Sequence, residues 1–114
     1  MTTEEEARIA RTESAFRHVN ERIAETAETF SSGDAEFVCE CADAECRERI
    51  EAPLHEYEEV RAEPTTFLVA EGHEVPAYEH VRLHRRGYLI VEKVTRGLAK
   101  AVRRTDPRAE QQPV

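Results

Sequence analysis

The most reactive side chains of this sequence are three cysteines that fall within eight residues. Cys39, Cys41 and Cys46 form the pattern C-x-C-x4-C, and the chain contains no other cysteine. Zinc binds four ligands in a tetrahedron and accepts thiolate sulfur readily. Three thiols carried by a strand, a turn and a returning strand can converge on one such ion. The pattern therefore predicts a Zn²⁺ site that still lacks one ligand.

Histidine is the natural fourth ligand, because no further cysteine exists. We favour His73, which follows Gly72 in a loop after a short apolar strand, where a side chain can be aimed at the cysteines. Glu71 or Glu74 could hold its imidazole in orientation. Three other histidines remain as alternatives, in the order His80, His84 and His55.

The ligands of the zinc ion also indicate whether it is catalytic or structural. A catalytic zinc ion keeps one coordination position open, and Glu40 or Glu45 could then act as a base. However, the sequence contains neither H-E-x-x-H nor the zinc deaminase pattern. A thiolate-rich ion is moreover a poor Lewis acid. We therefore expect a structural Cys3His site in a non-catalytic regulatory or protein-interaction module. The alternative is a thiol-based redox switch, in which oxidation of the cysteines releases the zinc.

Two resemblances accompany these residues. The C-x-C-x4-C spacing resembles the zinc motif that follows the catalytic domain of SET-type methyltransferases, where a further cysteine completes the site. Over residues 8–93 the chain resembles a group of short actinobacterial proteins with no assigned activity. That second resemblance is carried by residues 37–41 with Cys46, and by residues 56–61, 67–69, 72–74 and 88–93. It implies the same organisation and the pairing of His73 with the cysteines.

A long helix is predicted over residues 3–30, ahead of the cysteines. Thr3 and Glu6 have the spacing of a capping box. An apolar stripe with heptad-like spacing follows, made of Ile9, Phe16, Val19, Ile23 and Phe30. The stripe can pack on the helix's own domain, or it can pair with a partner protein or a second copy of the chain.

Short apolar segments separated by turns predict the rest of the fold. Strands are expected at 36–40, 47–51, 67–69, 78–84 and 88–94, and short helices at 53–63 and 95–104. Together these elements predict an α+β fold, in which the long helix lies beside a small antiparallel sheet domain held by zinc. We divide the chain into the helix and its loop (1–34), the zinc-knuckle domain (35–104) and a disordered tail (105–114).

Charge is distributed unevenly along the chain, whose net charge is -8. Residues 1–63 carry 18 acidic and seven basic side chains, whereas residues 64–114 carry six and nine. An acidic total disfavours general nucleic-acid binding, because phosphate contact needs positive potential. The basic segment 82–104 keeps weak nucleic-acid or partner contact as a third possibility, through Arg82, Arg85, Arg86, Lys93 and Arg96.

Length and composition limit the possible size, class and cellular location of the protein. The 114 residues suit one small domain. No segment approaches the roughly 18 apolar residues of a membrane-spanning helix. The first fifteen residues are acidic and lack the apolar region of a signal peptide. We therefore expect a cytoplasmic protein, in a compartment where thiols stay reduced.

Overall fold

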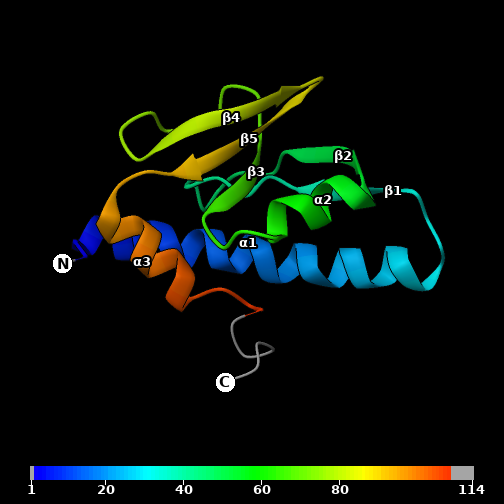
Figure 1. The fold of residues 1–114 in the computed structure, drawn as a ribbon, viewed down its shortest axis with the longest axis horizontal. Coiled ribbons are helices and arrows are strands. Elements are labelled where there is room, and N and C mark those ends of the chain that lie inside the picture. The colour runs from blue at the N-terminus through cyan, green and yellow to red at the C-terminus, as the bar shows by residue number, and fades with distance from the viewer. Residues whose placement is uncertain (1, 109–114) are drawn as a thin grey trace.

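The computed structural model describes residues 2–108, which form an α+β fold (Figure 1). A long N-terminal helix lies along one side of two small antiparallel sheets, so the predicted fold class is confirmed. The elements are α1 (Glu4–Thr29), β1 (Asp34–Val38), β2 (Arg49–Pro53), α2 (Leu54–Arg61), β3 (Thr66–Ala70), β4 (Glu79–Arg85), β5 (Tyr88–Lys93) and α3 (Arg96–Arg104).

The start of α1 follows from the predicted capping box. The backbone N–H of Glu6 donates to Thr3 Oγ1 at 3.0 Å, and the N–H of Thr3 donates to Glu6 Oε1 at 3.0 Å. These two bonds satisfy N–H groups that have no partner inside the helix.

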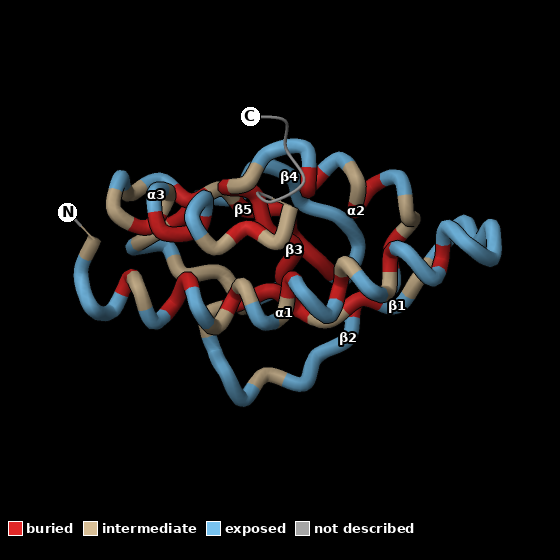
Figure 2. Tube along the Cα trace, turned by 90° about the horizontal axis from the view of Figure 1, so that it is seen from below, coloured by how far each residue is buried: buried red, intermediate tan, exposed pale blue. Residues whose placement is uncertain are grey.

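The strands form a two-stranded sheet and a three-stranded sheet. β1 pairs with β2, and Phe37 lies opposite Ile50. In the second sheet β5 lies between β3 and β4, with Leu68 opposite Ile90. The turn from β4 to β5 uses Gly87 at a φ of 87°, a left-handed conformation that glycine adopts without strain. Buried residues concentrate on β3 and β5 (Figure 2).

The face of α1 that packs on the sheets is largely polar, which the apolar stripe did not predict. Ile9 is buried, but Val19 is 46% exposed and Phe30 is 76% exposed. The buried face instead carries Glu6, Glu13, Arg17 and Asn20 among alanines. These polar side chains can be buried because distant parts of the chain supply partners for them.

Contacts cross the boundaries of the predicted segments. α1 packs on both α3 and β1. The predicted disordered tail begins at residue 105, yet Asp106 is buried and accepts a hydrogen bond from Arg61. Arg108 donates to Glu58 at 2.7 Å. The buried Arg61 guanidinium needs a carboxylate, and Asp106 provides it. Residues 109–114 lie outside the described part of the chain.

Candidate metal centre

The structure brings the three cysteines and His73 together, as predicted. One ligand atom from each residue lies within 4.8 Å of the others. The Nδ1 atom of His73 lies 3.7 Å from Cys39 Sγ and 3.6 Å from Cys46 Sγ. Cys39 and Cys41 are buried, whereas Cys46 and His73 are partly exposed. We call these four residues the Cys3His cluster.

The two Sγ–Nδ1 separations match the sulfur–nitrogen edge of a zinc tetrahedron. Zn–S bonds of about 2.3 Å and Zn–N bonds of about 2.0–2.1 Å at tetrahedral angles place sulfur and nitrogen roughly 3.5–3.6 Å apart. Both Sγ–Nδ1 separations fall within about 0.2 Å of that value. The residues present therefore fit a tetrahedral metal ion with three thiolate ligands and one imidazole ligand.

Backbone hydrogen bonds hold the segment that carries the three cysteines. The chain leaves β1 at Val38 and runs alongside β3, where the Glu40 N–H donates to the Leu68 carbonyl at 2.8 Å. The Ala70 N–H donates to Cys39 Sγ at 3.2 Å, which stabilises negative charge on that sulfur. A turn then closes the segment, with the Cys46 N–H donating to the Asp43 carbonyl at 3.0 Å. We call residues 39–46 the knuckle.

A second turn presents the histidine. It follows β3, and the His73 N–H donates to the Ala70 carbonyl at 3.0 Å. Gly72 has a φ of 86°, which a residue with a Cβ rarely adopts. A Cβ at Gly72 would meet no atom within 4 Å. Gly72 is therefore needed for its backbone conformation, and not because a side chain would lack space.

The three thiols differ in acidity. The pKa of Cys41 is lowered to about 5, because the Cys39 thiol donates a hydrogen bond to it. The pKa of Cys39 is raised by that same donation and by burial. Burial also raises the pKa of Cys46. Cys41 is therefore the thiol that most readily forms the thiolate, which is the form that binds a metal ion.

The other histidines lie away from the cluster. His84 Nε2 contacts Glu71 Oε1 at 3.1 Å, and His80 Nε2 lies 3.7 Å from Glu92 Oε1. His55 is exposed on α2. Glu71 is therefore engaged with His84 rather than with His73, and Glu74 Oε1 is buried with no hydrogen-bond partner in the described part of the chain. Among the described contacts, neither Glu71 nor Glu74 bonds to His73, so neither orients its imidazole as expected.

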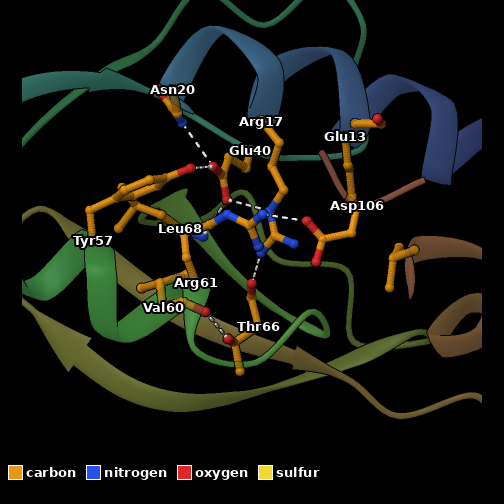
Figure 3. Close-up of polar contacts among 12 residues, drawn as sticks. Glu13, Arg17, Asn20, Glu40, Tyr57, Val60, Arg61, Thr66, Leu68 and Asp106 are labelled. Atoms are coloured by element: carbon orange, nitrogen blue, oxygen red, sulfur yellow. Dashed lines mark hydrogen bonds and ion pairs between the residues drawn. The ribbon is translucent and has the colours of Figure 1, made fainter. Parts of the chain in front are cut away.

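The sequence did not predict the role of Glu40, which lies between the first two ligands. Its side chain is fully buried and accepts hydrogen bonds from Asn20 Nδ2 and Tyr57 Oη, each at 2.9 Å (Figure 3). The Leu68 N–H donates to it at 3.1 Å, and Arg17 Nε lies 3.5 Å away. Glu40 is therefore occupied in the core and is no candidate for a base on the surface. Glu45, the other candidate, is exposed.

One of the five predicted basic contact residues, Lys93, lies in the core and not on the surface. Lys93 is buried between Glu13 and Glu79. Arg85 donates to Glu56 at 2.9 Å, and Arg82 lies 3.8 Å from Glu92. All four arginines are exposed, namely Arg82, Arg85, Arg86 and Arg96. Lys93 therefore serves the core, because two buried carboxylates require its charge.

No helix in residues 2–108 has the length and apolar character needed to cross a membrane. Comparison with protein-family models, curated proteins and solved structures found no match to this chain.

Proposed function

We propose that this chain is a zinc-binding module in which the ion has a structural role. Zn²⁺ bound by Cys39, Cys41, Cys46 and His73 would join the knuckle to the turn after β3. The observation that carries this proposal is the pair of Sγ–Nδ1 separations, 3.7 and 3.6 Å, which suit a tetrahedral ion. Bound structural zinc contributes directly to the free energy of folding.

The ligand set supports a non-catalytic site. Structural zinc sites have four protein ligands, whereas catalytic sites keep one position for water or substrate. Here the chain itself offers four ligand atoms. Three of them are sulfurs, which reduce the Lewis acidity of the ion. We therefore propose a regulatory or interaction module rather than an enzyme.

Metal analysis of protein purified under reducing conditions tests the proposal. We expect one zinc ion per chain, and Co²⁺ substitution should give the absorption of a tetrahedral thiolate site. Cys41→Ala should lose the ion and unfold the protein. His73→Ala should weaken binding, while His84→Ala is the matched control and should bind like the parent. Reduced protein that holds no zinc and takes up no cobalt would refute the proposal.

A redox switch at the same cluster is the second candidate, because part of the cluster reaches the surface. Cys46 and His73 are partly exposed, and a hollow lined by Cys41, Asp43 and His73 lies beside them. One peroxide molecule could oxidise Cys41 and Cys46 to a disulfide, take two protons from solvent and leave as two waters. The ion would be released. Rapid zinc release on mild peroxide treatment, reversed by a thiol reductant, would distinguish the switch from a purely structural site.

As an interaction module the chain would use the part of the apolar stripe that its own fold leaves uncovered. Val19 and Phe30 are exposed, and Val19 and Ile23 line a groove that continues to Ala35. Arg22 and Asp34 line the same groove. In a dimer with a two-fold axis, Arg22 of each copy could therefore pair with Asp34 of the other. We propose such a second copy as the occupant.

Sedimentation velocity over a range of protein concentrations tests this self-association. We expect a dimer that Val19→Glu converts to a monomer, while Val94→Glu, at another exposed valine, leaves the dimer intact. A parent protein that stays monomeric at high concentration would contradict the second copy. Such a result would leave the zinc proposal unaffected.

A further inference from the structure

We infer that Glu40 is a positioning residue for the metal site, through which the seating of α1 is coupled to metal binding. This inference rests on the proposed zinc function and adds to it. Glu40 coordinates nothing itself. It would act by fixing the backbone that carries the two buried ligands, Cys39 and Cys41.

The first step is the place of Glu40 in the chain. Glu40 is joined by peptide bonds to both buried ligands, Cys39 and Cys41. The position of its backbone therefore determines theirs. Its side chain has no exposed surface. Around its carboxylate lie donors from three elements: Asn20 and Arg17 on α1, Tyr57 on α2 and the Leu68 N–H on β3 (Figure 3).

The second step is the double role of Asn20. Its Nδ2 donates to Glu40 Oε2 and also to the Val38 carbonyl, both at 2.9 Å. Its Oδ1 accepts from the Val38 N–H at 2.8 Å. One side chain of α1 thereby holds the backbone on one side of Cys39 and the carboxylate on the other. The position of the backbone at Cys39 is therefore fixed relative to α1.

The third step is the consequence for binding. Ligands that are already in position lose less conformational freedom when the ion binds, so affinity rises. Partners behind metal ligands typically change metal affinity by about 10- to 100-fold when they are removed. The same coupling must act in reverse, so that bound metal holds α1 more firmly on the sheets.

Glu40→Gln tests the inference. The carboxylate accepts hydrogen bonds from Asn20, Tyr57 and the Leu68 N–H, and it forms an ion pair with Arg17. A glutamine amide would turn an N–H donor toward one of these donors. Glu45→Gln is the matched control, since it makes the same substitution and removes the same charge one residue before Cys46. The side chain of Glu45 is 88% exposed. Leu98→Ala, in the buried side of α3, is a second control that destabilises the fold away from the metal.

Chelator competition and the Co²⁺ absorption spectrum are the measurements. We expect Glu40→Gln to weaken Zn²⁺ and Co²⁺ binding by about 10- to 100-fold and to shift the cobalt bands. Glu45→Gln and Leu98→Ala should keep the parent spectrum. Tyr57→Phe removes one hydrogen bond from Glu40 and should show a smaller effect in the same direction, which keeps the test usable if Glu40→Gln does not fold.

Two results would overturn the inference in distinguishable ways. If Glu40→Gln and Tyr57→Phe keep the parent cobalt spectrum, and lose no more affinity than Leu98→Ala at equal loss of stability, then Glu40 has only a structural role. The zinc proposal would survive that result. If the parent protein binds neither zinc nor cobalt, both proposals fail together.

Discussion

Glu13 on α1 and Lys93 on β5 form an ion pair inside the core, with the Lys93 Nζ atom 2.9 Å from the Glu13 carboxylate. Lys93 also contacts Glu79 on β4. All three side chains are almost completely buried. Two carboxylates therefore share one ammonium group in a region that water does not reach, and this imbalance has a consequence for stability.

The imbalance makes stability depend on pH. Burial raises the pKa of Glu13 from 4.5 to about 7; the charge of Glu79 raises it further, while Lys93 and Arg17 oppose the shift. Between these two pKa values the folded state binds more protons than the unfolded state. The contribution of Glu13 to stability is therefore complete below about pH 4.5 and is lost as pH rises toward 7, by at most roughly 1.4 kcal/mol per pH unit.

Urea unfolding of the parent and of Glu13→Gln from pH 5.5 to 8 checks this expectation. The glutamine resembles protonated Glu13, so the variant should gain stability relative to the parent as pH rises. Metal binding also varies with pH, and the comparison of the two proteins at each pH removes that contribution. A difference between them that stays constant with pH would contradict the raised pKa.

Loss of the lysine should be costly. Lys93→Met leaves Glu13 and Glu79 buried without a counter-charge, and breaking a buried pair typically costs about 3–5 kcal/mol. Chemical denaturation measures this loss. Lys100→Met, on the exposed side of α3, is the control and should change stability little. A small effect at Lys93 would indicate that water or a proton compensates the two acids.

Replacement of Gly97 in α3 by alanine is expected to destabilise the protein, although alanine normally stabilises a helix. Alanine gains about 1 kcal/mol over glycine inside a helix. However, a Cβ at this position would lie 2.4 Å from Glu6 Oε1. That carboxylate is held by the Thr3 N–H and by the Thr95 hydroxyl, at 3.0 and 2.9 Å. We therefore expect Gly97→Ala to lower the free energy of unfolding.

A double-mutant cycle tests this reason. In a Glu6→Ala background the clash disappears, so Gly97→Ala should become stabilising by about 0.5–1 kcal/mol. Thermal unfolding of the four proteins gives the coupling energy. Equal effects of Gly97→Ala in both backgrounds would show that Glu6 moves aside without cost.

The strands and the ends of the helices could be predicted because their signals are local. The alternation of apolar residues, the capping box at Thr3 and the turn at Gly87 all lie within a few residues of the structure that they specify. The Cys3His cluster could be predicted for a similar reason. Three ligands are close in sequence, and few residue types can supply the fourth.

The buried polar residues could not be predicted, because their partners are distant in sequence. Glu13 meets Lys93 eighty residues later, and Asn20 meets Glu40 twenty residues later. Hydropathy places such residues on the surface of α1 and directs attention to Val19 and Phe30 instead. The knuckle shows the same failure, since an acidic residue between cysteines suggests solvent rather than a core position.

The segment after α3 offers a last test of these distant contacts. Arg61 on α2 is buried and bonds to both Asp106 and Glu21. Asp106→Asn removes one of its two counter-charges and should lower stability by about 1.5–3 kcal/mol, the usual value of a charged hydrogen bond. Glu63→Gln, at an exposed carboxylate near the end of α2, should have little effect. Hydrogen exchange should also quicken at residues 105–108 in the Asp106 variant. Unchanged exchange there would mean that the segment is held by other contacts, such as Arg108 with Glu58.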